Sequence, residues 1–217
     1  MSPRPVRARS RERIGILGGS FDPPHFGHLA LAEWARLELA LDRVVFVPAG
    51  LPPHKAGQAR STAAHRLAMT RLAVRDNPSF EVSPLETRRR GPSYTVDTVR
   101  SLAAAWPGAR LHLLMGADMF ATFDTWREPE GIAEHAVLVV AVRPGSRPPR
   151  RSRWTRRGQG VVWLSNPGLE VSSSAIRERA AAGWGTRYLV PDAVGRYAER
   201  HGLYRSTPRR AAKGTTT

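Results

Sequence analysis

A short apolar segment ends in two glycines and is followed by two histidines three residues apart, in RIGILGGSFDPPHFGH at residues 13–28. Ile14, Ile16 and Leu17 are typical of a strand buried on both faces of a parallel sheet. The residues that follow His28, LALAEWARLEL, have the apolar spacing of a helix. The segment therefore predicts a strand, a tight turn and a helix entry, which is the first half of a βαβ unit.

The turn of this unit has the composition of a phosphate site. Gly18 and Gly19 place no side chain between their N–H groups and a ligand. His25 and His28 flank the predicted helix N-terminus, where unpaired amides and the helix dipole favour an anion. Taken singly, the glycines fit a plain turn and each histidine fits a cap or a surface residue. Their combination favours phosphate binding.

Short apolar strands alternate with helical patterns along the body of the chain. We expect strands at 13–17, 44–47, 111–115, 137–142 and 161–164, and helices at 29–41, 65–74, 94–105, 173–182 and 192–201. This alternation predicts an α/β fold, a Rossmann-like doubly wound parallel sheet in a single domain. Because ligands of such sheets bind beyond the carboxyl ends of the strands, four of the loops should line one cleft.

The net charge of +16 is concentrated in three segments, since residues 1–13, 147–157 and 205–217 hold 14 of these charges. The rest of the chain is nearly neutral, which argues against a specific nucleic-acid surface within the fold. We expect a basic, disordered extension at 1–12, a domain at 13–205 with an Arg/Pro/Gly-rich insertion at 143–160, and a basic, disordered tail at 206–217. Weak attraction of RNA, or steering of anionic substrates, stays open.

The chain has no cysteine, which excludes disulfides, thiolate metal sites and cysteine redox catalysis. No stretch approaches the length of a membrane span. We therefore expect a cytoplasmic protein without a membrane partner. The sequence is compatible with a homo-oligomer.

Six motifs together resemble a known family. GGSFDPPHFGH resembles the signature of the HxGH nucleotidyltransferase superfamily, with His25, Gly27 and His28 in its defining positions. PPHK (52–55), PSYTVDT (92–98), GADMF (116–120), FDTW (123–126) and VSSSAIR (171–177) follow in the order and approximate spacing of bacterial nicotinate-nucleotide adenylyltransferases. The resemblance covers roughly residues 13–205. It implies transfer of the adenylyl group of ATP to nicotinate mononucleotide, which yields nicotinate adenine dinucleotide and pyrophosphate in NAD biosynthesis.

This reaction needs no general base, because the attacking phosphate is already ionised. It needs in-line positioning and groups that stabilise charge on the phosphates. We therefore assign catalytic roles to His25 and His28, without a covalent intermediate. The resemblance adds Arg177 to the catalytic residues, as a ligand of the pyrophosphate. The resemblance implies an ATP site made by Gly18, Gly19, Ser20, Phe21, Gly116, Asp118, Ser173 and Ser174. Serines at a helix start also fit an ordinary N-cap.

The resemblance places the other substrate against a second group of residues, namely His54, Lys55, Tyr94, Thr95, Trp126 and Arg143. Lys55 is one of only two lysines in the chain, and its ammonium suits a phosphate. Trp126 would stack on the pyridine ring, although core packing is an equal reading of the residue alone.

Magnesium is expected to arrive with ATP rather than in a protein site, and Asp22 is expected to stabilise its loop. Two rival functions stay open. One is an adenylyltransferase for nicotinamide mononucleotide or another phosphorylated acceptor. The other is a non-catalytic nucleotide- or RNA-binding protein, whose binding would weaken steeply with salt and survive loss of both histidines.

Overall fold

The computed structural model describes residues 11–51, 61–142, 152–156, 160–165 and 168–205. Six strands form one parallel sheet in the order β3-β2-β1-β4-β5-β6. The strands are β1 (Arg13–Gly19), β2 (Arg43–Pro48), β3 (Phe80–Val82), β4 (Arg110–Gly116), β5 (Ala136–Val142) and β6 (Val161–Ser165). This is the strand order of doubly wound nucleotide-binding folds. The predicted Rossmann-like α/β class is confirmed.

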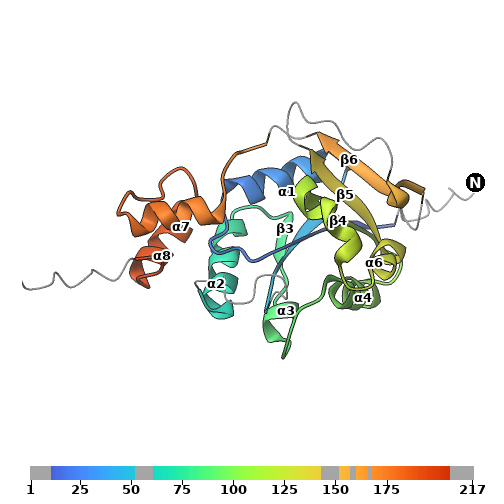
Figure 1. Cartoon of the computed structure of the whole chain (residues 1–217), viewed down its shortest axis with the longest axis horizontal. Helices are drawn as coiled ribbons and strands as arrows, with labels where there is room; N and C mark the ends of the chain where they lie inside the picture. Colours follow the sequence, from blue (N-terminus) through green and yellow to red (C-terminus); the bar gives the residue numbers. More distant parts are fainter. Residues whose placement is uncertain (1–10, 52–60, 143–151, 157–159, 166–167, 206–217) are drawn as a thin grey trace, which may run out of the picture.

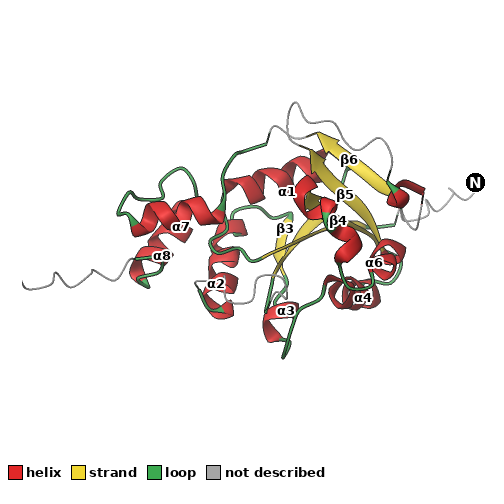
Figure 2. Ribbon diagram, viewed as in Figure 1, coloured by secondary structure: helices red, strands yellow, loops and turns green. Residues whose placement is uncertain are grey.

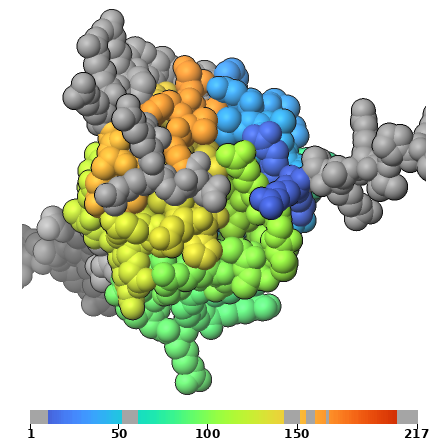
Figure 3. Space-filling model, turned by 90° about the vertical axis from the view of Figure 1, so that its right-hand side faces the viewer, coloured from blue at the N-terminus to red at the C-terminus, as the bar shows by residue number. Residues whose placement is uncertain are grey.

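Helices surround the sheet (Figures 1 and 2). They are α1 (Phe26–Glu38), α2 (Ala63–Val74), α3 (Leu85–Arg88), α4 (Thr95–Ala105), α5 (Ala117–Ala121), α6 (Pro129–His135), α7 (Ser173–Ala181) and α8 (Asp192–Arg200), with 3-10 turns η2 (Phe123–Thr125) and η3 (Arg153–Arg156). In the view of Figure 3, the start of β1 in blue, α4 in green, and η3 and β6 in orange lie on the face of the molecule that is shown. Among the described residues, no helix combines the length and apolar character needed to cross a bilayer.

Successive side chains of β1 point to opposite faces of the sheet and pack into two separate apolar clusters. Ile14 and Ile16 pack into the cluster that includes residues of α4 and α6, whereas Leu17 packs with residues of α1 on the other face. Gly15 faces α1, and a Cβ at this position would lie 2.9 Å from Leu41 Cδ1. Glycine at this position therefore lets Leu41, in the connection between α1 and β2, pack directly on β1.

A third apolar cluster joins the C-terminal helices to α2, which lies beside them in Figure 1. Its buried members are Met69, Ile176, Val190, Val194 and Ala198. Through this cluster the last part of the chain packs against the first half of the domain.

All predicted strands and helices are present, with small shifts at their ends. Helix α1 begins at Phe26 rather than at residue 29, so His28 lies inside its first turn. The sequence reading missed β3, α3, α5 and α6. Each is short, and the three residues of β3 give too little periodicity to be recognised. Most of the expected extension, insertion and tail lies outside the described residues.

We expect the protein to lose stability as the pH falls from about 6.5 to 4, because burial lowers the pKa of both His25 and His112 from 6.5 to about 4. In this window the unfolded chain binds protons that the folded chain does not bind, so the free energy of unfolding falls. Allowing for solvent screening, each histidine should contribute about 1–2 kcal/mol between pH 7 and pH 5.

Urea unfolding at pH 7 and pH 5 measures this effect. Burial raises the pKa of Glu86, which acts in the opposite direction, so a difference between variants is the cleaner quantity. His112 lies in β4, where its Nδ1 is 3.0 Å from the Arg110 carbonyl oxygen. The His112→Asn variant should show a smaller stability loss between the two pH values than the unsubstituted protein. An equal loss in both proteins would contradict the assignment.

Candidate active site

Several of the sequence-predicted site residues lie at or shortly after the carboxyl ends of parallel strands. Gly19, at the end of β1, is in register with Pro48 of β2, and Gly116, at the end of β4, is in register with Ala141 of β5. The loops after β1 and β4 therefore leave the same edge of the sheet, which is where doubly wound folds bind their ligands.

The β1 loop combines open backbone with a fixed aromatic ring. A Cβ added to Gly18 would meet no atom within 4 Å, so packing within the described residues does not require a glycine there. An approaching ligand would give it a role. Phe21 is buried with a φ of 50°, and its ring lies 3.1 Å from the Cβ position of Gly19. The strained Phe21 backbone thus turns the chain sharply toward α1.

His25 and His28 form a stacked pair at the start of α1. Their ring centroids are 3.7 Å apart with an interplanar angle of 28°, and the edge of Phe21 lies against His28 at 4.9 Å. The His25 backbone N–H donates to Nδ1 of His28 at 3.2 Å. A neutral His28 ring that accepts this bond at Nδ1 carries its proton on Nε2.

Burial lowers the pKa of His25 to about 4, so this imidazole is neutral at pH 7. A neutral imidazole still carries one N–H donor. Gly27 allows the ring its position, because a Cβ at residue 27 would lie 3.0 Å from Nδ1 of His25. The pair can therefore present hydrogen bonds to a phosphate without requiring two adjacent positive charges.

The start of α1 offers fewer free amides than we expected from the sequence. The Phe26 amide donates to the carbonyl of Leu189 at 3.1 Å, and the amides of His28 and Leu29 donate to the His25 carbonyl. The Leu29 bond is the first regular i→i−4 bond of α1, so the fold satisfies two donors, those of Phe26 and His28, that a helix N-terminus usually leaves open. The imidazole N–H groups therefore matter more as hydrogen-bond donors to a phosphate at this helix start.

The first turn of α7 is fastened to the loop that leads into this pair. Ser173 Oγ donates to the Pro23 carbonyl at 2.9 Å, and Arg177 Nη1 donates to the Asp22 carbonyl at 2.9 Å. Arg177 Nη2 also donates to Ser174 Oγ at 3.0 Å. The cap of α7 is Ser172, whose side chain accepts from the Ala175 amide. Capping therefore does not occupy Ser173 or Ser174.

The Asp22 carboxylate anchors the same loop, between β1 and α1, to more distant parts of the chain. It is buried, and it accepts from the Tyr204 hydroxyl at 2.7 Å and from the Ser61 amide at 3.3 Å. Burial, followed by the contact with this carboxylate, raises the pKa of the Tyr204 hydroxyl. Tyr204 therefore remains a hydrogen-bond donor across the working pH range.

Asp118 projects from the first turn of α5 as an exposed side chain at the end of β4. A Cβ on Gly116 would lie 2.5 Å from its Oδ1 atom. Glycine at 116 is therefore needed for Asp118 to hold this position.

The residues predicted for the pyridine ring lie around the start of α4 and the end of η2. Tyr94 caps α4, Thr95 is its first residue, and the Arg127 guanidinium stacks over the Tyr94 ring at 4.6 Å. Trp126 is half-buried, and its ring centroid is 5.4 Å from that of Phe123. Arg127, which follows Trp126 in the sequence, thus links the segment of Trp126 to Tyr94. His54, Lys55 and Arg143 lie outside the described residues.

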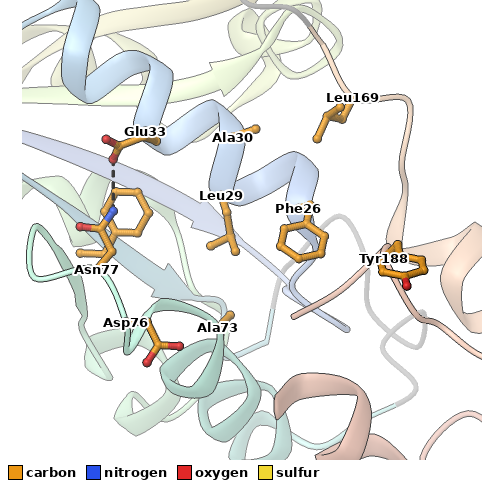
Figure 4. A pocket seen from close by; sticks show the side chains of 10 residues that line it. Phe26, Leu29, Ala30, Glu33, Ala73, Asp76, Asn77, Leu169 and Tyr188 are labelled. Carbon is orange, nitrogen blue, oxygen red and sulfur yellow. Dashed lines mark hydrogen bonds between the residues drawn. The ribbon is translucent and has the colours of Figure 1, made fainter. Parts of the chain in front are cut away.

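A separate hollow of about 570 Å³ lies between α1, the end of α2 and β3. Figure 4 shows Phe26, Leu29, Leu169 and Tyr188 along it, with Asn77 donating to Glu33 at one end. It is mainly apolar and contains none of the predicted site residues. It is therefore not the cleft formed by the strand ends.

One residue of this region was missed by the sequence reading. Arg66, in α2, is 2% exposed, and its guanidinium donates to the carbonyls of Ser20, Ala49 and Gly50. Its position relative to the buried Met69 and Thr70, three and four residues further on, could have placed it on the inner face of the helix.

Comparison with known proteins agrees with this geometry. The family model described as cytidylyltransferase-like matches residues 16–179. A probable nicotinate-nucleotide adenylyltransferase of Thermomicrobium roseum is 46% identical over 197 residues, which cover 89% of this chain and 92% of the relative. One from a Roseiflexus species is also 46% identical, over 88% of this chain and 98% of the relative.

The chain belongs to the nicotinate-nucleotide adenylyltransferase family. The resemblance seen in the motifs is thus confirmed, and the adenylyltransferase chain is an enzyme of the nucleotidyltransferase type rather than a non-catalytic binder.

Solved structures share the fold of this adenylyltransferase at low sequence identity. Plasmodium falciparum nicotinic acid mononucleotide adenylyltransferase, complexed with NaAD, has a TM-score of 0.72 at 17% identity and covers 89% of this chain and 98% of its own. A putative nicotinate-nucleotide adenylyltransferase from Vibrio parahaemolyticus has a TM-score of 0.64 at 19% identity, with coverages of 90% and 97%.

Proposed function

We propose that the protein transfers the adenylyl group of ATP to nicotinate mononucleotide and releases pyrophosphate, the adenylyl step of NAD biosynthesis. The observation that carries this proposal is the stacked His25–His28 pair at the start of α1, whose preceding loop is bound by Ser173 and Arg177 of α7. This arrangement supplies several hydrogen-bond donors to a polyphosphate. The reaction needs no nucleophile from the protein, because the phosphate of the mononucleotide attacks. The family of the chain supplies the substrate pair.

In the proposed reaction, an oxygen of the mononucleotide phosphate attacks the α-phosphorus of ATP. A new P–O bond forms as the bond to the bridging oxygen of the β-phosphate breaks, and pyrophosphate carries that electron pair away. His25 and His28 stabilise charge on the transferring phosphate through their N–H groups. Arg177 and the hydroxyls of Ser173 and Ser174 bind the leaving pyrophosphate, while Gly18, Gly19, Ser20 and Phe21 shape the ATP site.

At the other end of the cleft, Trp126 stacks on the pyridine ring, and Tyr94 and Thr95 orient it. Asp118 contacts the ribose or adenosine of ATP. His54, Lys55 and Arg143 complete the site in this proposal, with Lys55 on the phosphate of the mononucleotide.

The described residues include no group of three or more histidine and acidic side chains placed to hold a metal ion. The Asp22 carboxylate accepts from Tyr204 and Ser61 instead. We propose that Mg²⁺ arrives bound to the phosphates of ATP and not in a site made by the protein. When bound, this ion would offset phosphate charge. We place the reaction in the cytoplasm, which the cysteine-free composition fits.

The test is pyrophosphate release by the purified protein with ATP and magnesium. Nicotinate mononucleotide, nicotinamide mononucleotide and no acceptor are compared. We expect release with the acid, little with the amide and none without acceptor. If the amide is used in preference to the acid, the acceptor is nicotinamide mononucleotide and not nicotinate mononucleotide. A folded protein that binds ATP but releases no pyrophosphate with either acceptor would contradict the proposal.

The Trp126→Ala variant should raise the KM for nicotinate mononucleotide about 10-fold, since a lost aromatic stack costs roughly 1 kcal/mol or slightly more. The KM for ATP should change much less, because we assign Trp126 to the pyridine ring and not to ATP. Steady-state kinetics in each substrate measures both values. Trp184→Ala, which removes a tryptophan that is 67% exposed, is the matched control. Equal changes in both KM values would contradict the stacking role.

A further inference from the structure

Two oppositely charged side chains are buried beneath the loops that follow β1 and β2. Arg66 is 2% exposed and Glu86, in α3, is 8% exposed. Neither belongs to a motif of the family resemblance. Burying a charge is costly unless it is well hydrogen-bonded. The partners of the two side chains therefore show what their burial achieves.

Arg66 spans two loops with one guanidinium. Its Nη1 atom donates to the carbonyls of Ser20, at 3.0 Å, and of Ala49, while Nη2 donates to the carbonyl of Gly50 at 2.8 Å. Ser20 follows β1, and Ala49 follows β2. The loops are also joined directly, because the Ala49 amide donates to the carbonyl of Gly19 at 2.8 Å. The planar fork of arginine suits several carbonyls at once, which a single ammonium does not.

Glu86 holds the same segment from the opposite side. Its carboxylate accepts from the backbone N–H of Gly50 and, at 2.7 Å, from Thr98 Oγ1 in α4. The peptide group between Ala49 and Gly50 thus has its carbonyl bound by Arg66 and its N–H bound by Glu86. Gly50 is needed at this point, since a Cβ there would overlap the Glu86 carbonyl oxygen.

The Arg66 Nε atom has no hydrogen-bond partner among the described residues, so this guanidinium is not fully satisfied by hydrogen bonds there. Burial lowers the pKa of Arg66 and raises that of Glu86, so each charge is held against a desolvation penalty. Apolar replacements of either side chain would leave backbone groups of these loops without their hydrogen-bond partners. The hydrogen bonds of Arg66 and Glu86 thus fix where the backbone of the two loops lies.

We propose that Arg66 and Glu86 are positioning residues for adenylyl transfer, which clamp the Ala49–Gly50 peptide and the Ser20 carbonyl and so hold the β1 and β2 loops in the arrangement that binds the substrate phosphates. The inference rests on the proposed function. Arg66 acts through the backbone of Ser20, next to the glycines of the ATP site. Neither side chain contacts the reacting atoms.

The test compares Arg66→Lys, Arg66→Met and Glu86→Gln with the unsubstituted enzyme in the pyrophosphate assay, at a temperature where circular dichroism shows all of them folded. Leu41→Ala, which empties a buried apolar site at the opposite edge of the sheet, is a control for lost stability. We expect kcat to fall at least 10-fold in Arg66→Met and about as much in Arg66→Lys, because one ammonium cannot bridge both loops. We expect a smaller loss in Glu86→Gln, whose amide oxygen can still accept from Gly50.

Leu41→Ala should lower the Tm and leave kcat nearly unchanged. The inference is overturned if Arg66→Met keeps its kcat and both KM values while only its Tm falls. It is also overturned if Arg66→Lys regains full activity, because charge alone would then explain the residue. If the unsubstituted enzyme shows no activity, the proposed function fails instead, so the two failures are distinguishable.

Discussion

Replacement of His28 by alanine should lower kcat by about 10²- to 10³-fold with little change in the KM for either substrate. The variant loses the Nε2–H donor that we assign to the transferring phosphate, and removal of one such donor typically has this effect. It also loses the acceptor for the His25 amide and the stacking partner of the His25 ring. Steady-state kinetics with ATP and nicotinate mononucleotide measures the change.

The control is His135→Ala, since His135 is an exposed histidine in α6 that bonds within its own helix. This variant should keep full activity. His28→Asn should recover part of the lost kcat, because its amide retains a donor near the same place. A His28→Ala enzyme with normal kcat would refute the proposed role of the pair.

Replacement of Arg177 by methionine should lower kcat/KM for ATP by about 10²- to 10³-fold, because a cation aimed at the leaving pyrophosphate is lost. The side chain is held by the Asp22 carbonyl and by Ser174 Oγ. Its guanidinium is therefore already oriented before substrate binds. Arg177→Lys should recover only part of the loss, since an ammonium cannot keep both contacts and bind a phosphate as well.

The neighbouring Arg179 offers a matched control on the same helix. Its guanidinium lies over the ring of Trp184, and the side chain is exposed. Arg179→Met removes the same charge from α7 and should leave kcat/KM nearly unchanged. If the two variants lose equal activity, net charge rather than position explains the effect, and the assignment of Arg177 to pyrophosphate is wrong.

Sequence reasoning predicted the parts of this molecule that repeat a physical pattern over many residues. The buried strands β1, β2, β4 and β5 are mostly apolar, and α4 has clear helical spacing. Short elements such as β3 carry no such pattern and depend on tertiary contacts. The histidines could be singled out because their spacing, glycines and helix entry occur together in one segment.

Features that depend on distant residues could not be predicted in this way. The Phe26 amide at the start of α1 is occupied by the Leu189 carbonyl, more than 150 residues away in the sequence. The low pKa of His25 comes from burial by the whole fold. The clamp of Arg66 requires three carbonyls from two loops. A linear pattern contains none of these contacts.

The bond between Tyr204 and Asp22 joins residues separated by 182 positions, and it supports the loop that carries the histidines. The active site therefore becomes complete only when the end of the domain has docked onto its beginning. A chain still being synthesised can form most of the sheet yet lack a finished catalytic loop. For the same reason, a protease cut within α8 would abolish activity while leaving the sheet largely intact. Catalysis thus depends on docking of the segment that carries Tyr204, whereas most of the secondary structure does not.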